Sequence, residues 1–116
     1  MEAGTFIGVL FLARDVAHVE HLKTTSYAAH MATGQFYESV IELADKFAEV
    51  YQGLRGERIK VELQASTDSI EDVLNNHIRW INDHRDAICS DSSALSNIVD
   101  EVIGLYAKTL FLLTLK

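Results

Sequence analysis

The sequence predicts an all-α fold, a bundle of four helices in which one connection is long and the other two are short. Apolar residues recur at helical spacing over four segments. The chain has no proline and only 6 glycines, and one stretch of alternating residues separates the second helix from the third. With 116 residues, of which 48% are hydrophobic, the chain can form one domain, residues 1–116, but not two.

The first two helices are expected over about residues 5–31 and 35–52, with a short connection near Thr33 and Gly34. The first has apolar residues on two sides, which is typical of a helix that contacts two neighbours or a second subunit. The second is the most clearly amphipathic of the four. Opposite its apolar face it carries a row of acidic residues: Glu38, Glu42, Asp45 and Glu49. This row is either the solvated face of the helix or a surface for a basic partner.

The third and fourth helices are expected over about residues 68–88 and 94–115. Asp68 and Glu71 have the spacing of a capping box at the start of the third helix, and the serine-rich residues 90–93 cap the fourth. Phe111, Leu112 and Leu115 lie partly off the core face of the fourth helix. Apolar surface left over at a chain end predicts a contact with another subunit.

Residues 54–65 form the long connection. Ile59, Val61 and Leu63 alternate there with polar residues, a pattern that predicts an extended segment with one face buried. A dozen extended residues reach about 40 Å, enough to return along a helix of about eighteen residues. A single long crossover between two short connections is the connectivity of ferritin-like bundles.

Composition excludes several classes of function. The chain has 10 Lys and Arg against 17 Asp and Glu, a net charge of -7, whereas charge-driven nucleic-acid binding needs a basic surface. The apolar residues 4–13 are too few to cross a membrane, and no basic stretch marks them as a secretion signal. We therefore expect neither a membrane nor a nucleic-acid partner. The single cysteine, Cys89, is expected to be an inert thiol.

Two motifs in the first half resemble a known family. They are His21-Leu-Lys-Thr-Thr-Ser-Tyr-Ala-Ala-His30, followed by Phe36-Tyr37, and the later Tyr51-Gln-Gly53. Over residues 18–53 the chain resembles the first two helices of Dps-type ferritin-like proteins. Over most of its length it is more similar to small Dps-like proteins of uncharacterised role encoded by tailed phages, including cyanophages. This resemblance implies a phage protein that works in the host cytoplasm or in the virion.

The Dps resemblance also implies iron oxidation at a site shared between two subunits, and here the residues depart from the family. The histidine near the loop corresponds to His30. The next two ligands correspond to Val40 and Ala44, and the remaining two to Arg55 and Ile59, none of which supplies the family's ligand. The resemblance therefore supports the fold, while the activity does not follow from it.

Two other sets of residues could bind a metal such as iron or zinc. The first is His18, His21 and His30, at the end of the first helix. The second combines Glu20 with His77 and His84, which all fall on apolar arcs of their helices. The alternatives without metal are surface or interface histidines for the first set and a hydrogen-bonded core network for the second. We favour the alternatives without metal.

The leading hypothesis is a non-catalytic, self-associating phage-type protein that acts through protein–protein contacts. The apolar end of the fourth helix and the acidic row of the second would bind further copies, or other phage or host proteins, as a virion component or a host-directed accessory factor. The alternative is a Dps-like iron-binding protein or ferroxidase with a rearranged metal site.

Overall fold

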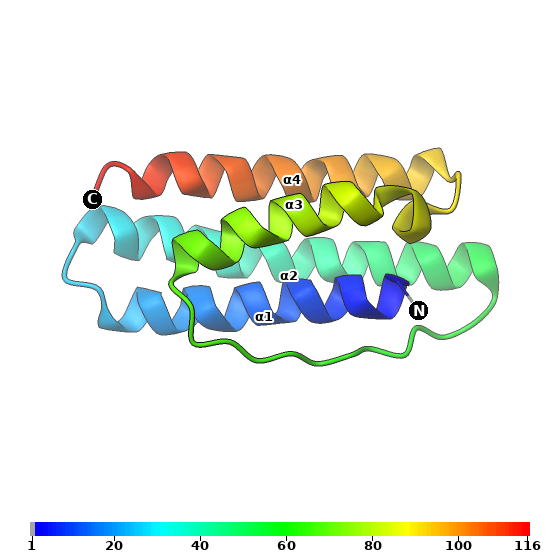
Figure 1. Cartoon of the computed structure of the whole chain (residues 1–116), viewed down its shortest axis with the longest axis horizontal. Helices are drawn as coiled ribbons and strands as arrows, with labels where there is room; N and C mark the ends of the chain where they lie inside the picture. Colours follow the sequence, from blue (N-terminus) through cyan, green and yellow to red (C-terminus); the bar gives the residue numbers. More distant parts are fainter. Residues whose placement is uncertain (1) are drawn as a thin grey trace.

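The computed structural model describes residues 2–116 and confirms the all-α prediction. Its helices are α1 (Glu2–Lys23), α2 (Tyr27–Arg55), α3 (Ile70–Cys89) and α4 (Ser93–Leu113). They form an elongated bundle of 45 × 23 × 22 Å (Figure 1). The described part of the chain contains no strand.

The long crossover decides how the helices are arranged. Because it carries the chain from one end of the bundle back to the other, α2 and α3 run in the same direction (Figure 1). These two parallel helices lie on one diagonal, and α1 and α4 lie on the other, since helix contacts occur only for the pairs α1–α2, α2–α4, α1–α3 and α3–α4. Each helix therefore packs between two antiparallel neighbours, with the connectivity of a ferritin-like bundle.

Aromatic rings from different helices meet in the core. Phe6 of α1 packs edge-to-face on Phe47 of α2, with ring centroids 4.8 Å apart, and Phe36 of α2 packs in the same way on Tyr106 of α4 at 5.2 Å. All four side chains are fully buried. Burying each of them stabilises the fold by about 1.5–3 kcal/mol.

The break between α1 and α2 lies nearer the N-terminus than the sequence pattern predicts. It falls at residues 24–26, where Ser26 caps α2 by accepting a hydrogen bond from the backbone N–H of Ala29 (3.2 Å). The predicted connection at Thr33 and Gly34 is wrong, because both residues lie inside α2. The glycine serves close packing instead, since a Cβ at Gly34 would stand 2.9 Å from the His21 ring.

The ends of α3 and α4 agree with the predicted ranges to within two residues. The expected capping box of Asp68 and Glu71 is wrong by one position. Ser69 is the cap, and its hydroxyl accepts a hydrogen bond from the N–H of Asp72 at 3.1 Å. The serine-rich connection caps α4 as expected, through Ser92 and the N–H of Leu95.

Residues 57–69, which we call the strap, run the full length of the bundle beside α1, as predicted for the long connection (Figure 1). Its predicted range of 54–65 begins too early, because α2 continues to Arg55. The strap docks through its backbone. The N–H of Glu62 donates to the carbonyl of Gly4 (3.2 Å), and the Thr5 hydroxyl donates to the Glu62 carboxylate (2.9 Å). A Cβ at Gly4 would stand 2.0 Å from the Lys60 carbonyl oxygen, and one at Gly8 would stand 1.7 Å from that of Glu62.

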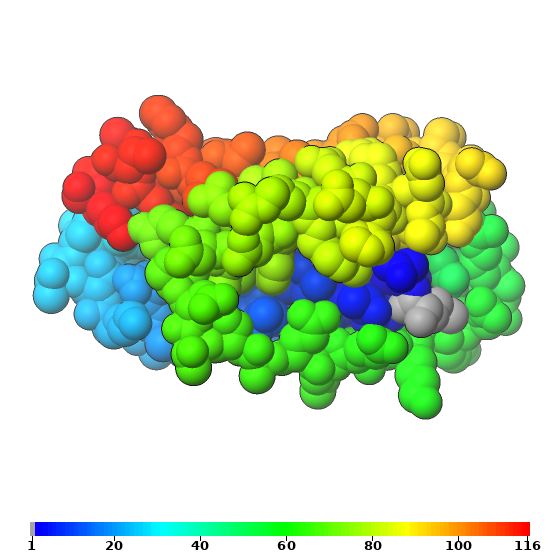
Figure 2. All heavy atoms as spheres, viewed as in Figure 1, coloured from blue at the N-terminus to red at the C-terminus, as the bar shows by residue number. Residues whose placement is uncertain are grey.

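The strap does not have the buried apolar face that its alternation predicts. Ile59 is half-buried, but Val61 is 38% exposed and Leu63 is 78% exposed. The physical reason is that two glycines of α1 admit the strap backbone itself, so carbonyl groups rather than side chains face the helix. In the space-filling view the strap stands along the surface, with α1 visible between it and α3 (Figure 2).

None of the helices in residues 2–116 combines the length and the apolar character needed to cross a membrane.

We predict that Gly8→Ala destabilises the protein by about 1–3 kcal/mol, because its methyl group would overlap the Glu62 carbonyl and must displace strap or helix. Gly104→Ala is the matched control, since nothing lies within 4 Å of a Cβ there and alanine favours a helix by about 0.5–1 kcal/mol. Urea unfolding of both variants measures the difference. Equal changes in the free energy of unfolding would contradict the close approach.

Candidate functional site

Large apolar side chains gather at one end of the bundle. At this end α1 and α4 finish and α2 begins (Figure 1). We call this set the apolar end. It includes six of the nine large hydrophobic side chains that are exposed in the described chain. They are Val19 and Leu22 on α1, Tyr27 and Met31 on α2, and Phe111 and Leu115 on α4 and just beyond it. Tyr27 is 77% exposed, and Phe111 and Leu115 are each 61% exposed.

A groove between α2 and α4 leads away from the apolar end. Its volume is about 310 Å³, and it is lined by Gln35, Glu38, Ser39, Leu105, Lys108, Thr109 and Leu112. The groove places Glu38, the first residue of the acidic row, near Leu112 of the apolar α4 segment. Sequence reasoning selected both residues but could not place them side by side, because only the packing of α2 on α4 joins them.

The acidic row is exposed along its whole length, at Glu38, Glu42, Asp45 and Glu49. No ion pair within residues 2–116 involves these carboxylates. The neighbouring Lys46 pairs instead across the helix interface with Glu101 of α4, at 3.0 Å. The row therefore keeps its negative potential, and Glu38 brings one of its carboxylates to the groove.

His21 and His30 form a reciprocal pair that holds α1 to α2. The Nδ1 of each ring lies 2.7 Å from the backbone carbonyl oxygen of the other residue. Because a carbonyl can only accept, both rings carry their proton on Nδ1. The rings stack with centroids 3.7 Å apart and planes within 18°. This pair, with the Ser26 cap, fixes the hairpin between the first two helices.

The geometry of this pair does not suit a shared metal. A ring nitrogen binds metal along a lone pair in the ring plane, and two stacked rings direct their lone pairs side by side rather than toward one point. The third member of the predicted set, His18, is exposed and stacks on Tyr37 with centroids 4.2 Å apart. The three histidines thus form an aromatic cluster over the α1–α2 junction.

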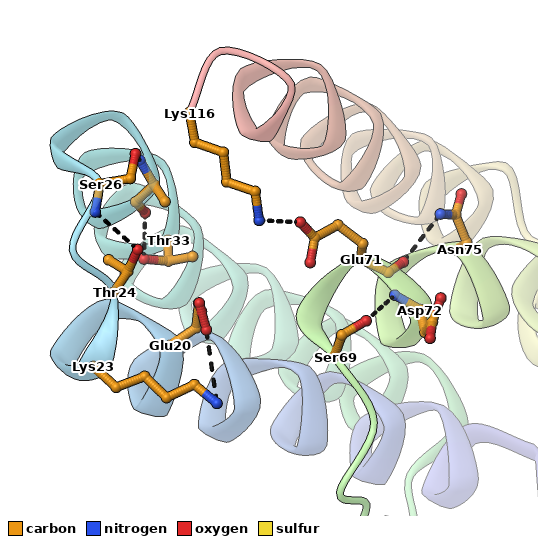
Figure 3. A network of polar contacts seen from close by, with 11 residues as sticks. Glu20, Lys23, Thr24, Ser26, Thr33, Ser69, Glu71, Asp72, Asn75 and Lys116 are labelled. Atoms are coloured by element: carbon orange, nitrogen blue, oxygen red, sulfur yellow. Dashed lines mark hydrogen bonds and ion pairs between the residues drawn. The ribbon is translucent and has the colours of Figure 1, made fainter.

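The structure separates the second predicted set. Glu20 is half-buried near the end of α1 and pairs with Lys23 at 3.8 Å (Figure 3). His77 is buried in α3 with its Nδ1 3.1 Å from the Tyr106 hydroxyl. His84 lies two turns further along α3, stacks on Trp80 and donates from Nδ1 to the Trp80 carbonyl at 2.8 Å. Each polar side chain is satisfied by its own neighbour.

Within residues 2–116, no three side chains of His, Cys, Asp or Glu come together as a potential metal site. Cys89 is buried, and burial raises the pKa of its thiol, which keeps the sulfur protonated at neutral pH and chemically inert.

Two features were missed in the sequence. One is a cavity of about 420 Å³ between α1 and the end of the strap, with Leu12, Val16, Val19 and Ile70 as its apolar lining and Glu20 and Lys23 on its polar side. The other is an ion pair between Lys116 at the C-terminus and Glu71 at the start of α3 (Figure 3). The Lys116 ammonium lowers the pKa of Glu71 through this contact. No local sequence signal links these segments, since the cavity forms where the strap runs along α1 and the ion pair forms where α4 packs antiparallel to α3.

The fold and these surfaces define a four-helix protein with one long crossover, an apolar end and no assembled metal site among the described residues. The chain belongs to a family described as a family of unknown function (DUF5856), whose model matches residues 21–113. It is similar to an "uncharacterized 14.6 kDa protein in mobD-ri intergenic region" of Enterobacteria phage T4. The two are 24% identical over 115 residues, which cover 99% of this chain and 90% of the relative.

These findings agree with the phage part of the resemblance drawn from the sequence motifs. Neither the family nor the phage T4 relative is described as a Dps or ferritin protein. No solved structure matches the chain.

We predict that His77 makes stability depend on pH. Burial lowers its pKa from 6.5 to about 4, so the folded protein keeps the ring neutral while the unfolded chain protonates it. Its contribution is fully present above pH 6.5 and is lost as the pH falls toward 4, a change of about 3 kcal/mol.

Urea unfolding between pH 4.5 and 7.5 measures this dependence. His77→Gln should flatten the slope of stability against pH, whereas Gly104→Ala, which removes no titratable group, should leave the slope unchanged. A wild-type slope retained in the His77 variant would contradict the prediction.

Proposed function

We propose that this protein is a non-catalytic phage accessory protein that self-associates and binds other proteins through the apolar end of its bundle. The observation that carries the proposal is the concentration of exposed apolar side chains there. Two are aromatic, Tyr27 and Phe111, and aromatic rings bury the largest areas in protein interfaces. Contiguous apolar patches of several hundred Å² on a soluble domain mark interaction sites.

The acidic row complements this surface. Carboxylates beside an apolar contact favour partners that carry basic residues, raise the association rate and disfavour acidic partners. Phe111 and Leu115 would supply affinity, while Glu38 and its neighbours would supply selectivity. The partners that fit are a further copy of the chain, or phage or host proteins, in the virion or in the host cytoplasm.

A Dps-like iron function is the competing proposal, and the crossover connectivity speaks for distant kinship with ferritin-like proteins. Its chemistry has little support in the residues. His21 and His30 use their Nδ1 atoms on backbone carbonyls and stack on each other, and Val40 and Ala44 occupy ligand positions of the Dps pattern.

The double variant Phe111→Ser/Leu115→Ser should weaken self-association by at least tenfold in Kd, because it removes two exposed apolar anchors while leaving the core unchanged. Sedimentation equilibrium at micromolar concentrations measures the effect. The matched control is Leu54→Ser, at a residue that is 57% exposed at the opposite end of the bundle. A monomeric wild-type protein, or an equal effect of the control, would overturn the assignment of the apolar end.

Iron chemistry is tested separately. Anaerobic addition of Fe²⁺ followed by oxygen, with absorbance and elemental analysis, should show no oxidation above the buffer rate and no bound iron. Stoichiometric iron that His30→Ala abolishes would favour the Dps-like function instead.

A further inference from the structure

The backbone of the strap is oriented by its contact with α1. The carbonyl oxygens of Lys60 and Glu62 both face α1, at Gly4 and Gly8. Four residues of helix rise about 6.0 Å, and two residues of extended chain rise about 6.6 Å. Because these distances are similar, the carbonyl groups of successive even-numbered strap residues meet successive turns of α1. The strap is therefore extended here, with the backbone groups of its even-numbered residues turned toward α1.

In an extended chain the N–H and C=O groups of alternate residues point to opposite edges. The backbone groups of Val61 and Leu63 consequently point away from α1, toward solvent. Among the described residues no hydrogen bond uses the backbone of either one. The Val61 and Leu63 side chains are also exposed. The outer edge of the strap thus has the two properties of an unpaired edge strand, free backbone groups and exposed apolar side chains.

The sequence of this edge is complementary to itself. In an antiparallel pairing centred on Val61, each Lys60 stands opposite Glu62 of the second copy, and each Ile59 stands opposite Leu63. Charged residues of opposite sign then meet on one face of the ribbon, and apolar residues meet on the other. In the same register, the hydrogen-bonded positions are the odd residues, the ones whose backbone groups point outward.

We propose that residues 59–64 of two copies pair as antiparallel strands, so that the strap is a self-association edge of this protein. The inference rests on the proposed function, and it assigns one contact of the oligomer to the strap. A second copy is the occupant that fits, because the edge carries both members of each charge pair. The N–H of Ile59 is already bonded to the Gln52 side chain at 2.9 Å, so Val61 and Leu63 form the centre of the pairing.

Charge exchange tests the register. Lys60→Glu places four carboxylates on the paired face and should raise the Kd for self-association by about tenfold. Glu62→Lys should act similarly by placing four ammonium groups there. An equimolar mixture of the two variants should recover association to within about threefold of wild type, since each introduced carboxylate then faces an introduced ammonium group of the other chain. Sedimentation equilibrium of each variant and of the mixture measures this.

The matched control for the charge change is Arg79→Glu, at an exposed residue of α3 that lies outside the strap, the apolar end and the α2–α4 groove. It should neither weaken strap association tenfold nor be rescued by Glu62→Lys. Val61→Pro removes an outward N–H and should also raise the Kd about tenfold, whereas Val61→Thr keeps that N–H and should not. Circular dichroism confirms that each variant keeps its helices.

The outcomes separate this inference from the proposed function. Strap variants that self-associate like wild type, or a mixture that shows no recovery, overturn the strap pairing. If Phe111→Ser/Leu115→Ser still weakens association in that case, the apolar end stands without the strap. If only the strap variants weaken association, the pairing holds and the apolar end is not the self-contact.

Discussion

The close approach of the strap to α1 is the constraint on which this structure depends. Gly4 and Gly8 lack side chains at the points where the Lys60 and Glu62 carbonyls touch the helix, and any Cβ there would overlap them. This contact lets the crossover lie flat along the bundle instead of bulging into solvent. The crossover that it holds in place makes α3 parallel to α2, and the outer edge of the strap faces away from α1.

The buried and half-buried histidines of this protein have structural roles. The reciprocal hydrogen bonds of His21 and His30 join α1 to α2. In each bond a ring N–H donates to the backbone carbonyl of the other residue, and together they close the hairpin between the two helices. His77 satisfies a buried tyrosine hydroxyl, and His84 caps a carbonyl of its own helix. Polar groups inside a small bundle must be bonded, and these four imidazoles meet that requirement with protein partners.

The apolar end is exposed because no helix of the bundle covers it. A square of four helices buries one face of each, and the apolar residues on the outer corners of α2 and α4 have no helix to cover them. Met31 and Phe111 are among these exposed residues. This apolar end, together with the outer edge of the strap, is the basis of the contacts with other chains that we propose.

The sequence by itself determined the four helices, the long crossover and the acidic row, because each depends on local periodicity and composition. It also selected Phe111, Leu112 and Leu115 as apolar surface. Tertiary structure alone decided the rest. Gly34 resembles a turn residue until His21 is placed against it, and Val61 and Leu63 resemble a buried face until the glycines of α1 admit the strap backbone. Glu20 and His84 resemble parts of one site until packing separates them. A contact between distant segments leaves no periodic signal, so local patterns could not reveal it.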